Sequence, residues 1–522
     1  MSSKSGITDK RTQTTFNFDL LPREICLQIF AEMNIMSKHS ALKVCRLWRT
    51  YATYTLEHLD RLAFFKLFRT EEAEKSWDNN PDTMPMGRKL NGALHQILRY
   101  CGSNLRILDM SDPCPDTGLF RANERTFQII GHYCLSLEEI YFDWLLLLND
   151  HLLEFCSKTN LSKITIVSFR GSFNHYVDIY SGLSAVYENC SQIQSIDISY
   201  SIKARVRDVQ ELWPTTLKEV YIDEAKMLTG YSIFSLSNCC PDLEVLSMCT
   251  TSYGMHPALD FVCRGFKALR KLIVSGYRGT VEAGKTIEQL TCLEELVLNN
   301  STMVTDEVMI TVVKRCTLLS KLDIGVDGPE EEQKFAVHGI VTDGTLEAIA
   351  NNLRCLKWLS LAGRHYFSDN GLCVVIVTNC NLQYLSVAYC RGITSSTLHN
   401  ILSDCQYISR LDISGLDDNL GRSDIIEFCQ NWIHRKQILA SENNIDLTQC
   451  NHSRSCHTKR ENVVIQRPYN LKIDAWYYSK DVLKFSAFLT DKIHRVSSIC
   501  DNEFTYDTMK PRKTVQICTE PW

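Results

Sequence analysis

One pattern of apolar residues recurs twelve times between residues 105 and 413, and it constrains the fold more than any other feature of the sequence. Each occurrence reads apolar-x-x-apolar-x-apolar, and the commonest steps between successive occurrences are 24 and 26 residues. A period of about 20 to 29 residues is typical of arrays in which every repeat supplies one short strand and one covering element. The occurrences are Leu105/Leu108/Met110, Leu137/Ile140/Phe142, Leu161/Ile164/Ile166, Ile193/Ile196/Ile198, Leu217/Val220/Ile222, Leu243/Leu246/Met248, Leu269/Leu272/Val274, Leu293/Leu296/Leu298, Leu319/Leu322/Ile324, Leu356/Leu359/Leu361, Leu382/Leu385/Val387 and Ile408/Leu411/Ile413.

Each repeat is expected to place a short strand before a helix. Alternate apolar residues of the strand point inward, whereas the stretch TDGTLEAIANNLRC from Thr342 has helical spacing and covers the other side. Four repeats carry a related turn whose Thr, Ser or Asp side chain is suited to capping the following helix. These turns are Val304-Thr305-Asp306, Val341-Thr342-Asp343, Phe367-Ser368-Asp369 and Ile393-Thr394-Ser395.

Cysteines occupy a recurring place in the repeats. Five of the 23 cysteines stand three residues before the apolar residue that opens a repeat: Cys134, Cys190, Cys240, Cys316 and Cys405. That regularity predicts reduced thiols that serve as small buried hydrophobes. With this cysteine before the next strand, the units resemble the cysteine-containing class of leucine-rich repeat. The consensus Asn or Cys three residues after the last apolar position survives almost only at Cys390.

Two segments upstream of the repeats have the pattern of a compact helical hairpin. They are DLLPREICLQIF at residues 19–30 and SALKVCRLWRTYA at residues 40–52. Pro22 suits the first turn of a helix. Apolar residues recur at helical spacing at Ile25, Ile29 and Phe30 in the first segment and at Leu42, Cys45 and Trp48 in the second. The two segments together resemble an F-box.

The resemblance to the F-box family covers about the first tenth of the chain and implies a set of adaptor-binding residues. Val44, Cys45, Arg46 and Trp48 match the family's later V-S/C-x-x-W pattern. The intervening AEMNIMSKHS departs from the family's usual leucine-aspartate turn. The implied adaptor-binding residues are Leu20, Leu21, Pro22, Glu24, Ile25, Ile29, Phe30, Leu42, Val44 and Trp48.

The sequence predicts four parts and an α/β fold. They are an F-box at 16–65, a linker with helical and irregular parts at 66–92, about 12 cysteine-containing leucine-rich repeats at 93–440, and a C-terminal tail or cap at 441–522. The repeats are expected to form a horseshoe-shaped solenoid of short parallel strands with outer helices, preceded by the small all-helical F-box. The charge, prolines and missing periodicity of the linker favour a separate F-box. The alternative is an ordinary helical cap that seals the first repeat.

This order of parts is that of F-box/leucine-rich-repeat proteins, the substrate receptors of SCF ubiquitin ligases. The resemblance implies that the F-box docks on a Skp-type adaptor, and through it a cullin, while the repeats hold a target protein for ubiquitination and proteasomal degradation. Such a subunit acts by proximity, so we expect no catalytic residue and no cofactor. Two alternatives are a leucine-rich-repeat scaffold or inhibitor that acts without a ligase, and a small-molecule receptor similar to the plant hormone-sensing F-box proteins.

The strand pattern predicts a target-binding row on the concave face. The strands KWLSL, QYLSV and SRLDI carry Trp358, Tyr384 and Arg410 at the same outward position. These residue types are enriched in binding hot spots, and the alternative is a stacked cluster that only stabilises its own sheet.

The longer step between Leu319 and Leu356 holds the run Glu330–Glu332, which would meet a basic partner or form a solvated loop.

Composition excludes several other classes. A net charge of -5 and a pI near 6.3 argue against nucleic acid as a partner, and no apolar run approaches the length that a bilayer requires. A signal peptide is not supported, so we expect a cytoplasmic and/or nuclear protein without membrane attachment. Cys450, His452, Cys456 and His457 match no structural zinc spacing, so no metal is expected. Phosphate-loop, zinc-protease and nucleophile-elbow motifs are absent from the sequence.

Overall fold

The computed structural model forms two compact units, residues 1–172 with 181–192 and residues 173–180 with 193–522. It describes residues 21–67, 87–111, 122–145, 147–172, 180–201, 213–225, 228–249, 258–326 and 339–405, then shorter pieces up to 431 and residues 472–476 and 514–516. Leu20, the run Glu330–Glu332 and the four Cys and His residues between 450 and 457 lie outside the described residues.

The first unit begins with three helices, where the sequence predicted a two-helix hairpin. They are α1 (Arg23–Glu32), α2 (Ile35–Ala41) and α3 (Arg46–Glu57). The additional helix starts because the Asn34 side chain accepts the Ser37 amide hydrogen bond at 2.8 Å, which caps the first turn of α2. Leu42 therefore lies at the end of α2, on a different helix from Trp48, and Cys45 is the N-cap of α3.

The rest of the first unit alternates strands with helices. Its strands β1 to β4 pair in parallel and in chain order. Its elements are β1 (Arg61–Ala63), η2 (Phe65–Leu67), α5 (Gly87–Cys101), η4 (Gly102–Asn104), β2 (Ile107–Asp109), α6 (Glu124–Tyr133), β3 (Glu139–Tyr141), α7 (Asn149–Lys158), β4 (Ile166–Ser168) and α8 (Tyr180–Asn189).

The F-box helices pack directly on the first repeat. Strand β1 lies inside the predicted F-box yet pairs with β2, and α5 begins inside the predicted linker. Leu62 on β1 is fully buried. The Asn104 side chain donates to the Glu57 carbonyl of α3 at 2.7 Å. The helical unit therefore also closes the first end of the sheet, as a solenoid cap does.

Eleven of the twelve predicted strand registers are confirmed, and the third is wrong by three residues. The sequence placed Ile164 at the centre and Ile166 as the last inward residue, but β4 is centred on Val167 and buries Phe169. Ile166 is only half-buried. The stretch ITIVSF offers two apolar frames, and burying the larger Phe169 ring selects the second.

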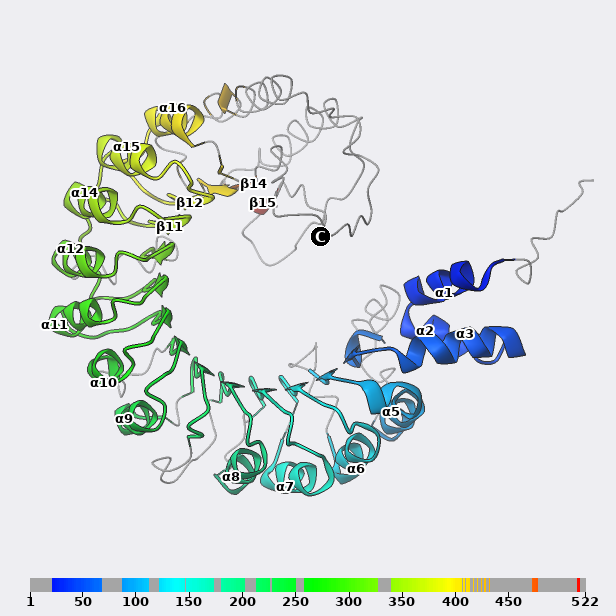
Figure 1. The fold of residues 1–522 in the computed structure, drawn as a ribbon. Coiled ribbons are helices and arrows are strands. Elements are labelled where there is room, and N and C mark those ends of the chain that lie inside the picture. Colours follow the sequence, from blue (N-terminus) through cyan, green and yellow to red (C-terminus); the bar gives the residue numbers. More distant parts are fainter. Residues whose placement is uncertain are drawn as a thin grey trace, which may run out of the picture. The chain divides into compact units, whose positions relative to one another are not determined.

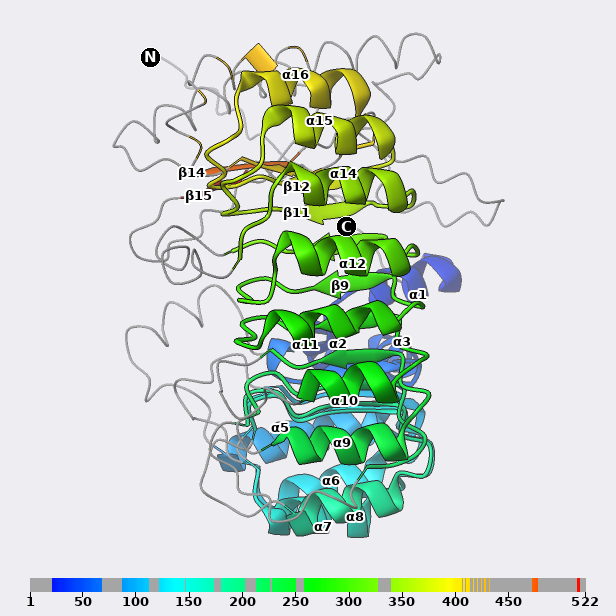
Figure 2. The same cartoon turned by 90° about the vertical axis from the view of Figure 1, so that its left-hand side faces the viewer.

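The second unit continues the strand and helix alternation. Strands β5 to β13 pair in parallel in chain order, β14 adds to β13 in parallel, and β15 pairs antiparallel with β14. The strands lie on one side of this unit and its helices on the other (Figure 1), and the helices stack in chain order (Figure 2). The elements are β5 (Ser195–Asp197), β6 (Glu219–Tyr221), α9 (Gly230–Cys239), β7 (Val245–Ser247), α10 (Ala258–Gly265), β8 (Lys271–Ile273), α11 (Val281–Lys285), η8 (Thr286–Gln289), β9 (Glu295–Val297), α12 (Asp306–Arg315), β10 (Lys321–Asp323), α14 (Asp343–Asn352), β11 (Trp358–Ser360), α15 (Asp369–Thr378), β12 (Tyr384–Ser386), α16 (Ser395–Asp404), β13 (Arg410–Asp412), β14 (Lys472–Trp476) and β15 (Thr514–Gln516).

The recurring cysteines are buried, as predicted, and several close the helices. Cys240 and Cys316 are the C-cap residues of α9 and α12. The Cys240 thiol donates to the Pro214 carbonyl at 3.1 Å, and burial raises the pKa of both thiols to about 12. A thiol that stays protonated in the core behaves as a small hydrophobe with a weak donor.

In four repeats, the residue at the consensus Asn/Cys position links neighbouring turns, and in three of the four it is neither Asn nor Cys. Its side chain donates to the carbonyl of the last inward residue of the preceding repeat, so neighbouring turns stay linked. The donors and acceptors are Ser172 to Phe142, Ser301 to Val274, Arg364 to Ile324 and Cys390 to Leu361.

The predicted Thr and Ser caps are confirmed, and an aspartate ladder joins them across repeats. Thr342 and Ser368 each accept an amide hydrogen bond in the first turn of their own helix. The carboxylate of Asp306 accepts from the Thr342 amide and hydroxyl, and that of Asp343 accepts from the Ser368 amide and hydroxyl. Each helix start in this stretch is thus tied to the next. Across the described ranges, the helices are too short or too polar to cross a lipid bilayer.

Candidate functional site

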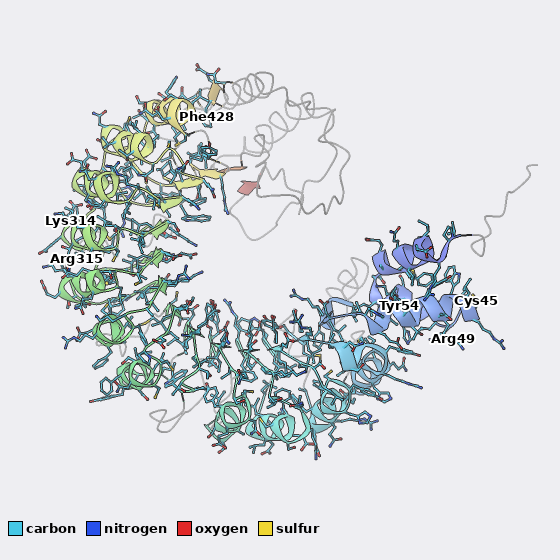
Figure 3. The ribbon with its side chains drawn as sticks, in the orientation of Figure 1. Cys45, Arg49, Tyr54, Lys314, Arg315 and Phe428 are labelled. Carbon is cyan, nitrogen blue, oxygen red and sulfur yellow. The ribbon has the colours of Figure 1, made fainter. Side chains whose placement is uncertain are left out.

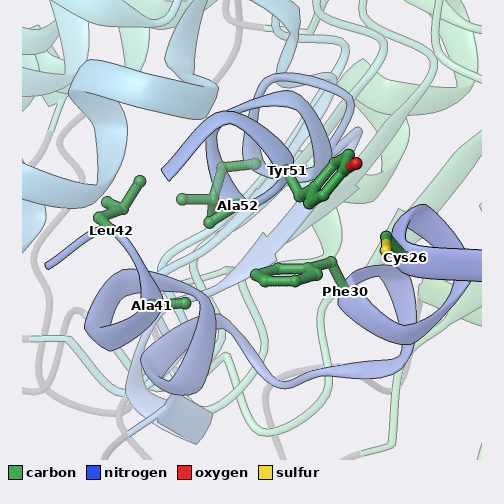
Figure 4. Close-up of a cluster of buried hydrophobic side chains, with 7 residues drawn as sticks. Cys26, Phe30, Ala41, Leu42, Tyr51 and Ala52 are labelled. Carbon is green, nitrogen blue, oxygen red and sulfur yellow. The ribbon is translucent and has the colours of Figure 1, made fainter. Parts of the chain in front are cut away.

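The F-box helices share a small core that fixes which residues are left for a partner. Its buried members are Cys26, Phe30, Ala41, Leu42, Tyr51, Ala52 and Leu56 (Figure 4). The Phe30 ring lies 5.6 Å from the Trp48 ring and 5.8 Å from the Tyr51 ring, measured between centroids. The prediction that Phe30 and Leu42 contact an adaptor is therefore corrected, because both side chains are used inside the helical unit.

An apolar surface remains exposed on the same helices. Ile25 and Ile29 of α1 are each 41% exposed, Met36 of α2 is 39% exposed, and Val44 is 61% exposed. The sequence expected Ile25, Ile29 and Phe30 to share one face, but α1 turns Cys26 and Phe30 inward and leaves the two isoleucines outside.

The remaining predicted F-box residues flank this surface. Pro22 and Glu24 are exposed, and Leu21 and Trp48 are half-buried. Cys45, which caps α3 by accepting the Trp48 amide hydrogen bond, is exposed at the start of that helix (Figure 3). The structure thus brings most of the predicted adaptor residues to the surface of one three-helix unit.

A hollow of about 340 Å³ lies between α2 and the start of α3. Its lining is mostly apolar or small, which suits an apolar side chain of a partner. The lining residues are Asn34, Met36, Ser37, Ser40, Ala41, Val44 and Trp48. Met36 was missed by the sequence reasoning because it lies in AEMNIMSKHS, where the family pattern gave no match.

The predicted row on the second unit has the expected register. Trp358 of β11 pairs with Tyr384 of β12, and Tyr384 pairs with Arg410 of β13. The two aromatic rings stack with centroids 3.7 Å apart and an interplanar angle of 15°. The Arg410 guanidinium carbon lies 5.3 Å from the Tyr384 ring centroid.

Lys321 extends this row by one strand, and the sequence reasoning did not name it. Its ammonium nitrogen lies 4.8 Å from the Trp358 ring centroid, and β10 pairs with β11 in the same register. The ring faces are therefore covered by neighbours of the same row, and the ring edges and the two cations are what a partner would meet. Burial raises the pKa of Tyr384 to about 12, so its phenol stays protonated at neutral pH. In the described part of the chain, no three metal-ligating side chains gather closely enough to hold an ion.

Comparison with known proteins identifies a domain in the first unit. Residues 18–55 match the F-box domain family. A search of curated proteins found no significant match. Among solved structures, a chain of the yeast Rad7 and Elc1 complex is 14% identical over 77% of this chain and 94% of its own length, with a TM-score of 0.47. A chain of a TLR13 complex with ssRNA13 is 13% identical over 63% of this chain and 44% of its own length, with a TM-score of 0.38.

The matched domain and the repeats give the order of parts in the chain. The chain carries an F-box domain, followed by a solenoid of parallel strands and helices. This order, an F-box domain followed by a repeat solenoid, is the one that the sequence predicted.

Proposed function

We propose that this chain is the substrate-recognition subunit of an SCF-type cullin ubiquitin ligase. In this proposal the F-box docks on a Skp-type adaptor, and through it a cullin, while the repeats hold a target protein for ubiquitination and proteasomal degradation. The chain supplies no acid, base or nucleophile, because holding the target near the ubiquitin-conjugating enzyme raises the rate by proximity. Such a subunit would act in the cytoplasm and/or nucleus.

The exposed apolar surface of the F-box carries the adaptor proposal. Large side chains at Ile25, Ile29, Met36 and Val44 face solvent within one short helical unit whose core is already complete. Clustered apolar residues of this kind mark a protein interaction site, because covering them releases free energy. The same unit closes the end of the sheet through Asn104 and β1. That role does not use the exposed surface, which favours adaptor docking over a cap alone.

Adaptor affinity of the Ile25→Ala/Ile29→Ala variant tests this proposal. Each isoleucine is 41% exposed, and covering that part contributes about 1 kcal/mol. The double variant should therefore bind a purified Skp-type adaptor about thirtyfold more weakly than the unchanged chain, by calorimetry.

The matched control is Val374→Ala/Val377→Ala on α15, which truncates two apolar residues that are 43% and 55% exposed. Its adaptor affinity should equal that of the unchanged chain. If all three proteins bind the adaptor equally well, the exposed F-box surface is not the adaptor-binding site.

The row Lys321–Trp358–Tyr384–Arg410 is the proposed anchor for the target. The pre-stacked rings and their two cations offer a rigid contact area that loses little side-chain entropy on binding. Shape and chemistry of the row are fixed before a target arrives, because each ring is held by its neighbour on the adjacent strand.

Proteins co-purified with the adaptor-bound chain while the proteasome is inhibited provide the test. A target should be depleted from the Trp358→Ala/Tyr384→Ala/Arg410→Ala variant and retained by Tyr231→Ala/Phe234→Ala, which changes exposed aromatic residues of α9. A chain that retains every partner after loss of the row would exclude the row as the anchor.

A further inference from the structure

A buried lysine joins the first two F-box helices. The Lys38 side chain on α2 is only 4% exposed. Its Nζ donates to the Ala31 carbonyl in the last turn of α1 at 3.0 Å. Carbonyl groups in the last turn of a helix have no hydrogen-bond partner within that helix, and the Ala31 carbonyl is one of them. A cation at this end also interacts favourably with the helix dipole.

This placement carries a free-energy cost that an apolar residue would avoid. Burial lowers the pKa of Lys38, and the nearby Glu32 carboxylate offsets only part of that effect. A lowered pKa means that the folded protein holds the ammonium charge less readily than water does. Methionine at position 38 would fill the same space without the cost of burying a charge. We therefore attribute the ammonium group to the arrangement of α1 and α2 that its hydrogen bond fixes, and not to a gain in stability.

The two helices that Lys38 joins, α1 and α2, carry different parts of the exposed surface. α1 presents Ile25 and Ile29, whereas α2 contributes Met36 and most of the wall of the hollow. Only Met33 and Asn34 separate the two helices in the chain. Among the described side chains, Lys38 makes the hydrogen bond that crosses from α2 to α1.

A second clamp of the same kind follows along the chain. Arg49 on α3 donates through Nε to the Leu42 carbonyl at the end of α2, at 2.9 Å. In both clamps a cation reaches back seven residues to the carbonyl end of the preceding helix. The relative placement of three short helices is therefore set by two cation-to-carbonyl bonds as well as by the shared apolar core.

We propose that Lys38 is a positioning residue for adaptor docking, which holds the isoleucines of α1 and the hollow beside α2 in one docking surface. The inference rests on the proposed adaptor function. It assigns a role to AEMNIMSKHS, the segment in which this F-box departs from its family. Lys38 itself is buried and does not touch the adaptor; it acts through the two helices that do.

The test compares Lys38→Met with Lys314→Met in the full chain. Lys314 is an exposed lysine of α12, far along the chain, and its replacement makes the same change of charge (Figure 3). Adaptor affinity is measured by calorimetry, and F-box stability by hydrogen exchange of the α3 backbone amides. Lys38→Met should bind the Skp-type adaptor about tenfold more weakly, with α3 amides protected at least as well as in the unchanged chain. Lys314→Met should change neither quantity.

Separation of affinity from stability distinguishes a positioning role from a merely structural one. Affinity within about twofold of the unchanged chain, or a parallel loss of affinity and α3 protection, overturns the inference. If the unchanged chain does not bind the adaptor, the proposed function fails and this inference fails with it. If the unchanged chain and Lys38→Met bind equally well, only this inference fails.

Discussion

Replacing Asp343 by alanine should weaken the contact between two neighbouring repeats of the second unit. Asp343 is the first residue of α14, and its carboxylate accepts the Ser368 amide at 2.8 Å and the Ser368 hydroxyl at 2.7 Å. Ser368 is in turn the N-cap of α15. The substitution removes the acceptor for a partly buried amide at the start of the next helix, and it removes an acidic group from the first turn of α14.

The expected loss follows from these contacts. Leaving the Ser368 amide without an acceptor costs about 1–3 kcal/mol, and losing an acidic residue at a helix start costs about 0.3–1 kcal/mol. The middle of the summed range is about 2–3 kcal/mol, and Asp343→Asn should lose about half of this because its side chain keeps one acceptor. The loss should be local, because the stability of stacked repeats is largely a sum of nearest-neighbour terms.

Native-state hydrogen exchange of the α15 amides is the suitable assay. A loss of 2–3 kcal/mol corresponds to exchange that is about 30 to 150 times faster. Asp150→Ala is the control, because Asp150 also lies in the first turn of a helix, α7, and is exposed. Unchanged exchange in α15, or equal acceleration there by Asp150→Ala, would refute the view that the aspartate ladder couples the repeats.

Two further predictions concern the first unit. Gly171→Ala should destabilise it by at least about 1–2 kcal/mol, because Gly171 has φ 68° and an added Cβ would lie 2.2 Å from the Trp144 ring; limited proteolysis should cut the variant faster than the unchanged chain. His151 accepts the amide at the N-cap of α7 through Nδ1, and burial lowers its pKa. The unfolded chain therefore binds the proton more tightly, so this contribution is present above the ordinary histidine pKa and is lost as pH falls below it. Thermal unfolding should show it as a drop in stability on acidification that His151→Gln, which keeps a side-chain acceptor, lacks.

The strands were predictable because their period and their buried residues are visible in the sequence. The failure at β4 has a local cause: ITIVSF contains two overlapping apolar frames, and only the burial of Phe169 decides between them. The second F-box helix was missed because its start depends on the Asn34 side chain rather than on an apolar pattern.

A backbone turn that recurs after the strands could not be predicted from the sequence either. Four residues after the central strand residue, the backbone adopts positive φ in most described repeats, yet the residue type there varies. These residues are Trp144, Gly171, Tyr200, Glu224, Gly276, Asn300, Gly363 and Tyr389. Only some of them are glycine or asparagine, the residues that favour this conformation. The recurring positive φ accompanies the backbone hydrogen bonds between neighbouring repeats, and the residue types at these positions do not reveal it.

The candidate surfaces were predictable in position but not in detail. The aromatic row followed from strand register, and its stacking partners followed from side-chain geometry that only the structure provides. On the F-box, family matching grouped core and surface residues together. The structure separates Phe30 and Leu42, which hold the helices together, from Ile25, Ile29 and Val44, which are exposed.

Reconstitution of the full chain with a purified Skp-type adaptor and a cullin tests the central claim most directly. The proposed ligase role predicts one stable complex that contains all three proteins and that is lost when Ile25 and Ile29 are both replaced by alanine. If the folded chain forms no complex with the adaptor and cullin, the ligase role is contradicted, and the chain is a leucine-rich-repeat scaffold whose first helices serve only as a cap.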